Sequence, residues 1–173
     1  PESGQVVKGA RAVVRTDVLE VEIDANGGDL RRVLLLAYRE GDAAPLKFLG
    51  EQAGRIYIAQ SGFVGGGLPS HKTPYELVPG DYTLKPGQDE LRVAMKAVVD
   101  GVEVVKTYVF RRGSYVLDLH YAVHNGSQAA VEGFPYYQFV RHGHAPEGES
   151  AMIQTFTGPA IYTELGKFQK VSF

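Results

Sequence analysis

The fold is decided by residues 91–139, which read LRVAMKAVVDGVEVVKTYVFRRGSYVLDLHYAVHNGSQAAVEGFPYYQF. From Leu91 to Val99, apolar side chains occupy every second position, and this period of two is typical of a β-strand with one buried face. The next two residues, Asp100 and Gly101, form a pair that commonly closes a hairpin between right-twisted strands. The pattern therefore predicts that the chain reverses at this pair.

Two further glycine-containing turns follow in the same stretch. Residues 102–112 form the returning strand, and Arg-Gly-Ser at residues 112–114 turns the chain again. Residues 115–124 form the next strand, Asn125-Gly126 makes a third turn, and residues 127–139 run back. Together these segments predict a four-stranded antiparallel meander.

Residues 11–38 predict a second group of strands. Within residues 11–24 the alternation is clean from Leu19 onward, and the Asn-Gly-Gly sequence at residues 26–28 accepts positive φ at little cost. Residues 29–38 form the strand that follows, so a hairpin or a tight corner is expected. Further short strands are predicted at residues 45–49, 55–60, 82–84, 151–157, 160–163 and 168–173.

The whole pattern indicates one all-β domain. The length of 173 residues is typical of a single domain, and the 21 glycines and nine prolines between short apolar runs favour many turns and short strands. No amphipathic helix and no internal repeat are recognisable. Residues 61–74 and 142–150 are rich in glycine, proline and polar residues and are predicted to be loops.

Composition and charge exclude several classes of function. A net charge of −2 without a basic patch argues against a nucleic-acid partner, since such binding requires clustered Lys and Arg. With no cysteine in the chain, disulfides and thiolate metal sites are excluded. No apolar run approaches the roughly 18–20 residues that span a bilayer.

Both ends of the sequence suggest a piece of a longer protein. Residues 1–11 read as the remnant of a linker, and the domain is expected over residues 12–173. The last residues, KFQKVSF, read as a strand that stops at Phe173 without a turn or a tail. We therefore expect the N-terminal portion of a larger β domain.

Two loops contain residue types that can bind ions. The three glycines at residues 65–67 could hold a phosphate, but the spacing of the known phosphate loops is absent and no helix follows, so a loop is favoured. His142 and His144, with Glu147 and Glu149, could bind a divalent metal. Their spacing matches no strong metal motif, so a solvated loop is favoured and no metal or other cofactor is predicted.

The polar residues of one predicted strand suggest a weak alternative with sugar chemistry. Asp118, His120 and His124 share one face of the strand at residues 115–124, and a carboxylate and an imidazole could act as an acid/base pair. A polar outer face is the favoured interpretation. No nucleophile elbow and no catalytic carboxylate pair stand out, so no catalytic residue is predicted.

Four segments resemble the periplasmic domain of the YidC membrane protein insertase family. They are TDVLEVEIDANGGDLRRVLLLAY at residues 16–38, IYIAQSGFVG at residues 56–65, KTYVFRRGSYVLDLHYAVHN at residues 106–125, and FTGPAIY at residues 156–162. The resemblance covers nearly the whole chain from about Ala12. The first and third segments are the most specific, because each combines strand pattern, turn chemistry and charged positions.

The resemblance implies a fold, a location and a role. The fold would be an antiparallel β-supersandwich, similar to galactose mutarotase, and incomplete here because the family domain continues beyond the position of Phe173. The location would be the periplasmic face of the inner membrane in a Gram-negative bacterium. The insertase activity would belong to transmembrane helices outside this chain, so the domain would be non-catalytic.

The resemblance also implies partners. The domain would help inner-membrane proteins insert and fold by contacting nascent chains or SecDF, the accessory subunits of the Sec translocon. The contact region would lie at residues 138–173, and it would include Phe156, Tyr162, Lys167 and Phe168. Aromatic side chains are common anchors of interfaces. For Phe156 and Tyr162 taken singly, a place in the core is the favoured alternative.

Two rival functions remain open from sequence. One is a carbohydrate-binding or mutarotase-like domain, which requires His120 or His124 close to a carboxylate in a cleft. Since a fold does not confer an activity by itself, the family likeness to mutarotase does not decide this. The other is a module that pairs an extended peptide with an open sheet edge, and this is compatible with the insertase role.

Overall fold

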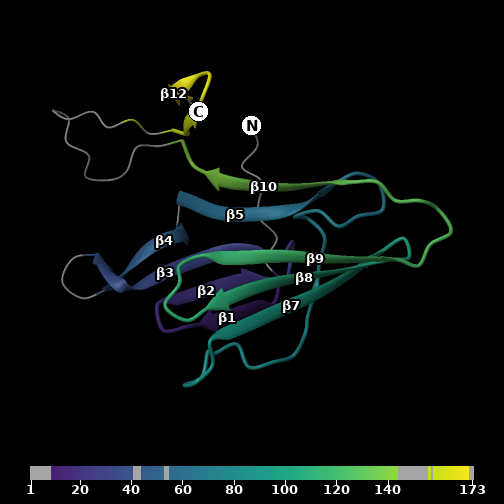
Figure 1. The fold of residues 1–173 in the computed structure, drawn as a ribbon, viewed down its shortest axis with the longest axis horizontal. Helices are drawn as coiled ribbons and strands as arrows, with labels where there is room; N and C mark the ends of the chain where they lie inside the picture. The colour runs from purple at the N-terminus through teal and green to yellow at the C-terminus, as the bar shows by residue number, and fades with distance from the viewer. Residues whose placement is uncertain (1–8, 41–43, 53–54, 144–155, 157, 172–173) are drawn as a thin grey trace. The chain divides into compact units, whose positions relative to one another are not determined.

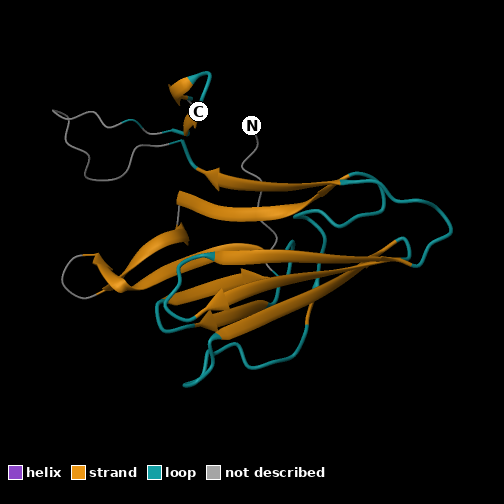
Figure 2. Ribbon diagram, viewed as in Figure 1, coloured by secondary structure: helices purple, strands orange, loops and turns teal. Residues whose placement is uncertain are grey.

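The computed structural model describes residues 9–40, 44–52, 55–143, 156 and 158–171. These residues form β-strands, turns and loops, and none of them is helical (Figure 2). Accordingly, no helix among the described residues could cross a membrane. The all-β prediction is confirmed for this part of the chain. The chain divides into two units, residues 1–140 and 141–173, which are described separately.

The first unit contains a six-stranded sheet with the order β1-β2-β3-β4-β5-β10 (Figure 1). Its strands are β1 (Arg11–Arg15), β2 (Leu19–Asp24), β3 (Asp29–Glu40), β4 (Ala44–Gln52), β5 (Arg55–Val64) and β10 (Phe134–Arg141). Residues 11–24 are thus two antiparallel strands. Thr16 separates them, because its hydroxyl accepts a hydrogen bond from the Leu19 amide at 2.9 Å and stabilises the turn.

The first unit also contains a four-stranded antiparallel sheet with the order β6-β7-β8-β9. Its strands are β6 (Glu76–Leu77), β7 (Glu90–Val99), β8 (Val102–Arg111) and β9 (Leu117–Asn125). The predicted turn between β7 and β8 is confirmed, since Asp100 and Gly101 have φ values of 48° and 82°. Positive φ at both positions is the signature of the turn that matches strand twist.

The prediction that the chain returns after residue 126 as the fourth strand of the meander is wrong. Residues 134–141 form β10, which lies beside β5 in the other sheet and not beside β9 (Figure 1). The Asn125 side chain explains the departure: its Oδ1 accepts a bond from the Ser127 amide at 3.0 Å, and its Nδ2 donates to the Ala129 carbonyl at 2.8 Å. These local bonds hold the chain in a loop instead of a tight hairpin, and it then crosses to the other sheet.

Several other strand predictions need adjustment. Strand β5 continues to Val64, so the predicted loop at residues 61–74 begins only after it. The predicted strand at residues 82–84 is reduced to an isolated bridge between Thr83 and Arg15. The predicted strand at residues 151–157 lies largely outside the described residues, which include only Phe156 of that segment.

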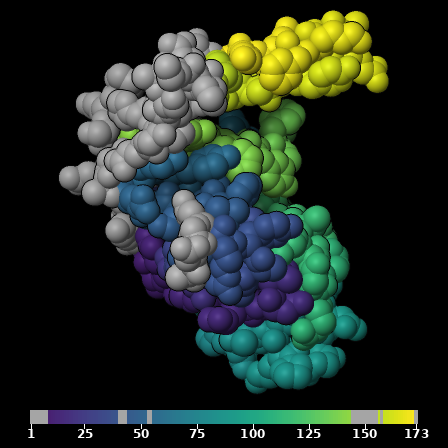
Figure 3. Space-filling view, turned by 90° about the vertical axis from the view of Figure 1, so that its left-hand side faces the viewer, coloured from purple at the N-terminus to yellow at the C-terminus, as the bar shows by residue number. Residues whose placement is uncertain are grey.

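The core of the first unit is built from both sheets. Val14, Val21 and Ile23 from the six-stranded sheet are fully buried, as are Val93 and Met95 from the four-stranded sheet. These residues belong to one hydrophobic cluster. In the space-filling view, the purple and blue strands pack directly against the teal ones (Figure 3). Burying one face of each sheet against the other is the usual way in which an all-β domain is stabilised.

The second unit contains a short hairpin. Strands β11 (Ala160–Thr163) and β12 (Lys167–Lys170) pair antiparallel, with Tyr162 opposite Phe168. The Gly166 amide donates a hydrogen bond to the Thr163 hydroxyl at 2.8 Å and closes the turn. The strand predicted at residues 160–163 is confirmed, and the one predicted at residues 168–173 begins one residue earlier.

Candidate functional site

A cleft of about 680 Å³ lies in the first unit and is lined by strands of both sheets. Its lining residues are Leu30, Ala59, Gln60, Ser61, Tyr108, Leu117, Asp118, Leu119, His120, Tyr137, Gln138 and Phe139. Strands β3, β5 and β10 supply one wall, while β8 and β9 supply the other. A mostly apolar cleft with a few polar groups is the usual form of a ligand site.

The apolar part of the cleft extends further along the sheets. A second cavity of about 420 Å³ shares Leu30, Ala59, Leu117 and Phe139 with the first. The remaining lining residues of this second cavity are apolar or aromatic. The two cavities therefore form one groove that an extended apolar segment could occupy.

Strand β10 presents aromatic side chains at the cleft. Tyr137 and Phe139, two residues apart on the same face, are 65% and 66% exposed. The Phe139 ring lies 5.9 Å from the ring of Tyr57 on β5, and Tyr57 lies 6.4 Å from Phe48 on β4. This aromatic row offers large contact area with few rotatable bonds, which favours binding of apolar side chains.

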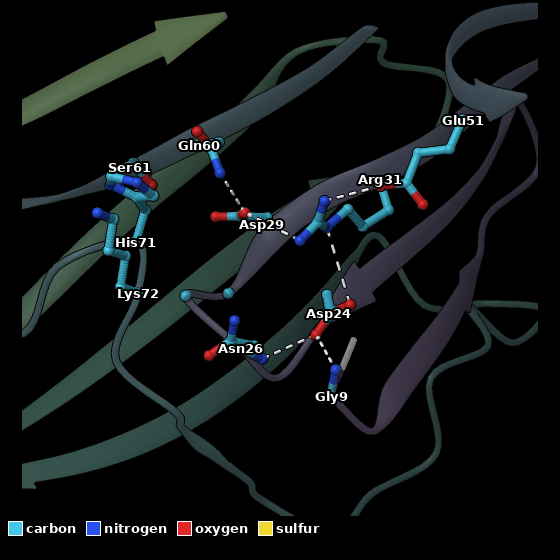
Figure 4. A network of polar contacts seen from close by, with 12 residues as sticks. Gly9, Asp24, Asn26, Asp29, Arg31, Glu51, Gln60, Ser61, His71 and Lys72 are labelled. Atoms are coloured by element: carbon cyan, nitrogen blue, oxygen red, sulfur yellow. Dashed lines mark hydrogen bonds and ion pairs between the residues drawn. The ribbon is translucent and has the colours of Figure 1, made fainter. Parts of the chain in front are cut away.

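The polar floor of the cleft is formed by Gln60 and Ser61 on β5. Gln60 donates to Asp29 Oδ2 at 2.7 Å (Figure 4). It also accepts a hydrogen bond from Gln138 at 2.8 Å. The Ser61 hydroxyl accepts a hydrogen bond from the Tyr121 hydroxyl at 3.0 Å. The floor therefore links β10, β5, β3 and β9 through side chains.

A fully buried lysine lies beneath this floor. The Lys106 Nζ on β8 donates to the Gly27 carbonyl at 2.8 Å and to the Ser61 carbonyl at 3.3 Å, both of which belong to the other sheet or its turn. It also lies 5.5–5.8 Å from the ring centres of three tyrosines, Tyr75, Tyr108 and Tyr121. Burial lowers the pKa of Lys106 to about 7, because removing water disfavours the charged form.

The backbone of Gly28 permits the close approach of this lysine. Gly28 has a φ of 65°, and a Cβ there would lie 2.6 Å from Met95 Sδ and 3.0 Å from Lys106 Nζ. The Gly28 carbonyl accepts a bond from the Tyr108 hydroxyl at 2.8 Å. The Asn-Gly-Gly turn thus brings bare backbone against β8, where a side chain would not fit.

Buried charges extend from the lysine along β3. Asp29 is fully buried, and its pKa is raised to about 6, mainly because burial disfavours the carboxylate. Arg31, only 1% exposed, lies 3.6 Å from Asp29, 3.8 Å from Asp24 and 2.7 Å from Glu51 (Figure 4). Buried charges need such partners, since an isolated charge is costly to bury.

His71, in the loop after β5, is hydrogen-bonded to Tyr136 on β10 beside this network. Its backbone amide donates to the Tyr136 hydroxyl at 2.9 Å, and its ring Nδ1 also contacts that hydroxyl. Burial, with added repulsion from Lys72, Lys106 and Arg31, lowers the pKa of His71. The Nδ1 of a neutral imidazole can accept a hydrogen bond from the tyrosine hydroxyl, so the contact favours the neutral ring.

The predicted sugar-chemistry residues are only partly brought together. Asp118 and His120 line the cleft, whereas His124 does not. The Asp118 carboxylate forms an ion pair at 2.6 Å with Arg111, which lies on β8. Asp118 and His120 therefore share one cleft, where the Asp118 carboxylate is engaged by Arg111.

The candidate ion sites gain no support from the described residues. Among them, no group of three or more His, Asp or Glu side chains could hold a metal; His142 is described, but His144, Glu147 and Glu149 lie outside the described residues. Of the three glycines at residues 65–67, Gly65 has a packing role. A Cβ on Gly65 would lie 2.4 Å from the Glu132 carbonyl oxygen.

The four predicted partner-contact residues lie in the second unit. Tyr162 and Phe168 are 68% and 61% exposed and face each other across the hairpin. Lys167, at the start of β12, is exposed, and Phe156 is 39% exposed with Lys170 Nζ 5.1 Å from its ring centre. In this structure Phe156 and Tyr162 are surface residues, so their alternative interpretation as core residues is wrong.

The fold and the cleft define an all-β domain with a largely apolar cleft between two sheets. Comparison with known proteins is consistent with this class: the family model described as YidC periplasmic domain matches residues 11–173. The chain therefore belongs to the YidC periplasmic domain family. The family description places the domain in the periplasm.

Curated relatives agree with this assignment. Over its full length the chain is 49% identical to the membrane protein insertase YidC of Thiobacillus denitrificans and 46% identical to that of Laribacter hongkongensis, covering 32% of each relative. It is 42% identical to that of Nitrosospira multiformis over 99% of the chain and 31% of the relative. The chain thus spans about a third of the length of these relatives.

Proposed function

We propose that this chain is the non-catalytic periplasmic module of a membrane protein insertase that helps inner-membrane proteins insert and fold. The module binds apolar segments of nascent membrane proteins in its inter-sheet cleft. The observation that carries this proposal is the exposed aromatic wall of β10, where Tyr137 and Phe139 are about two-thirds exposed beside an apolar groove. Exposed apolar surface of this kind marks interaction sites.

The size and chemistry of the groove support an apolar segment as its ligand. Two overlapping cavities of about 680 and 420 Å³ fall within the range of ligand sites. Gln60 and Gln138 at the floor offer amide groups that can pair with a peptide backbone. A segment of a nascent membrane protein requires both kinds of contact, because its side chains are apolar and its backbone groups need hydrogen-bond partners.

Peptide titration followed by NMR tests this use of the cleft. A short apolar peptide with solubilising lysines at its ends is expected to shift the amide signals of β9 and β10 and to leave those of β1 unchanged. The double variant Tyr137→Ser, Phe139→Ser is expected to weaken binding at least about tenfold, since each aromatic anchor typically contributes more than about 1 kcal/mol and about 1.4 kcal/mol corresponds to a factor of ten. Val13→Ser, on an exposed position of β1, is the control. Equal binding by the β10 variant would contradict the proposal.

We also propose a contact of the second unit with SecDF. The exposed pair Tyr162 and Phe168, flanked by Lys167, supports an interface anchored by aromatic residues with a charged rim. This surface is separate from the cleft in sequence. The parent protein would therefore use one unit for nascent chains and the other for the translocon.

A pull-down with the accessory subunits tests this contact. The double variant Lys167→Glu, Phe168→Ala is expected to lose most of the binding. The control is the double variant Lys72→Glu, Val64→Ala, which makes the same lysine-to-glutamate change and shortens an exposed apolar side chain in the first unit. Both variants must keep the circular dichroism spectrum of the wild type. Undiminished capture of the accessory subunits by the first variant would refute the assignment.

A carbohydrate ligand is the second candidate, because Asp118 and His120 line the same cleft. The ion pair of Asp118 with Arg111 makes it the weaker candidate, since the carboxylate is already engaged. A thermal-shift screen with common hexoses and oligosaccharides discriminates. A true ligand at a hundredfold excess over Kd stabilises the fold by about 2.7 kcal/mol; a shift for any sugar would favour this candidate.

A further inference from the structure

Two of the four sheet edges in the first unit are open and border the cleft. Among the described residues, β9 pairs only with β8, and β10 pairs only with β5. The other two edges are covered or short, because the Arg15 backbone on β1 is hydrogen-bonded to Tyr82 and Leu84, and β6 has only two residues. Covering or shortening an edge is how proteins keep its unpaired backbone groups from recruiting another strand. The edges of β9 and β10, in strands of nine and eight residues, show neither of these two devices.

The turn between β7 and β8 fixes which backbone groups of β9 face its open edge. A two-residue turn of this type closes on a hydrogen-bonded pair, and such pairs then recur at every second position of an antiparallel ladder. Counted along β8 to its other neighbour, Thr107 is bonded to His120 on β9. The same count places the Ala94 carbonyl at the outer edge of β7, where it does accept a hydrogen bond at 3.0 Å from the residue after β6. Leu119 and Tyr121 therefore direct their backbone N–H and C=O groups away from β8.

The space beside this open edge lies opposite β10. The Tyr108 hydroxyl on β8 donates to the Gly28 carbonyl, in the turn before β3. On the next strand, β9, the ring of Tyr121 lies 4.8 Å from that of Phe63 on β5. Since β3 and β5 are neighbours at this point and β10 follows β5, one step outward from β9 corresponds to β10 in the facing sheet. A strand added to β9 would therefore lie opposite β10.

The cleft at this place continues the core between the two sheets. Four residues that pack against the buried cluster also line the cleft, namely Leu30, Ala59, Leu117 and Leu119. Tyr137 and Phe139 on β10 are largely exposed, because no described strand lies opposite them. The carboxylate of Asp118, the only one among the lining residues, is paired with Arg111. An occupant of this space extends the core, so its inward side chains should be apolar and uncharged.

We infer that the occupant is an extended segment of a nascent membrane protein that joins the four-stranded sheet as an antiparallel strand next to β9. This inference rests on the proposed use of the cleft. The pairing is antiparallel because every pairing in this sheet is antiparallel. The backbone groups of Leu119 and Tyr121 bind the segment, and its inward side chains contact Tyr137 and Phe139. Since side chains of a strand alternate between two faces, only every second residue of the segment needs to be apolar.

Antiparallel pairing decides which amides of the segment are used. Two residues that form a hydrogen-bonded pair lie directly opposite each other and place their side chains on the same face of the sheet. The side chains of Leu119 and Tyr121 point toward the other sheet, so the segment residues bonded to them also point inward. The N–H groups of the inward, apolar residues therefore donate to β9, while those of the outward residues face away from it.

Two N-methylated peptides test this pairing on the unaltered 173-residue chain. The parent peptide alternates leucine and serine over about eight residues, the usual strand length, with lysines and a dye at its ends for fluorescence anisotropy. N-methylation of the leucines is expected to weaken binding at least about tenfold, because it removes the donors to β9. N-methylation of the serines adds equally many methyl groups and is expected to change the affinity less than about twofold, since these amides face away from β9.

Hydrogen exchange locates the pairing along the chain. Binding of the unmodified peptide should slow exchange of the Leu119 and Tyr121 amides, which face the open edge. The His120 amide, which is bonded to β8, should keep its rate. Protection confined to β10 amides would overturn the assignment to β9.

The affinities also separate the pairing from the cleft itself. If the two methylated peptides bind equally well, while the unmodified peptide still depends on Tyr137 and Phe139, the added strand is overturned and the cleft stands. Absence of binding by the unmodified peptide overturns the proposed use of the cleft and the inference with it. A dimer of the free chain that the peptide dissociates would place a second copy in the cleft and overturn the choice of a nascent segment.

Discussion

Single residues decide how closely the two sheets approach. Gly28 is the clearest case, because its carbonyl accepts from Tyr108 and its Cα faces Met95 and Lys106. The position requires both a left-handed backbone and the absence of a side chain. Among the described residues, Gly27 and Gly65 combine the same two requirements against backbone atoms, whereas Gly28 meets buried side chains of the four-stranded sheet.

Replacing Gly28 with alanine should destabilise the fold strongly. A left-handed non-glycine residue costs about 1–2 kcal/mol, and overpacking adds about 1–3 kcal/mol. We expect a loss of about 2–5 kcal/mol in the free energy of unfolding, measured by urea denaturation. Gly113→Ala is the matched control, since Gly113 has a similar φ of 67° but nothing within 4 Å of a Cβ. Equal losses in both variants would refute the packing role of Gly28.

The buried lysine should make stability depend on pH. Its pKa is lowered to about 7 in the folded chain and is about 10.4 when unfolded. Between these values the unfolded chain binds more protons, so the contribution of Lys106 to stability rises with pH and is smallest below pH 7. The difference in unfolding free energy between wild type and Lys106→Met should therefore shift in favour of the wild type from about pH 7 to 9.5. A difference that stays constant over this range would contradict the account.

The sequence contains a signal for the burial of Lys106, because this residue falls among the alternating apolar positions of its strand. On β8, Lys106 falls in phase with Val102, Val104 and Tyr108, all of which are buried. Asp29 and Arg31 likewise fall in phase with buried Val33 on β3. Charged residues in phase with an apolar face indicate buried charges, yet the pattern cannot say which residues meet across the sheets.

At the scale of elements, the strands were predictable and one pairing was not. Alternation and turn residues indicate β7, β8 and β9, because each turn joins neighbours in sequence. The pairing of β10 with β5 depends on contacts between distant residues, such as Tyr136 with His71 and Gln138 with Gln60. Local patterns carry no information on such contacts, and for this reason the predicted meander included one strand too many.

The contact of His71 with Tyr136 should anchor β10 to the loop after β5. Tyr136→Phe removes the hydroxyl that accepts from the His71 amide, with an expected loss of about 1 kcal/mol. Hydrogen exchange should show faster exchange of β10 amides, with no change in the β7–β8 hairpin. Tyr137→Phe removes an exposed hydroxyl from the next residue and serves as the control. Unchanged exchange in β10 would mean that strand pairing alone holds it.

At the scale of the whole molecule, residues 11–173 match the family described as YidC periplasmic domain. The relatives are described as membrane protein insertases, and the chain spans about a third of their length. The family could be identified from sequence, because long segments match a known pattern. The cleft could not, since its walls come from β5, β9 and β10, which are far apart along the chain.

Site-specific photo-crosslinking in the parent protein tests the central claim most directly. A photoreactive phenylalanine analogue replaces Tyr137 in the cleft or, as a control, the exposed Val13 on β1, while a membrane protein is being inserted. The account predicts crosslinks from position 137 to apolar segments of the nascent chain and none from position 13. Crosslinks at position 137 only to the parent protein itself, or equal crosslinking at both positions, would contradict the claim that the cleft receives nascent chains.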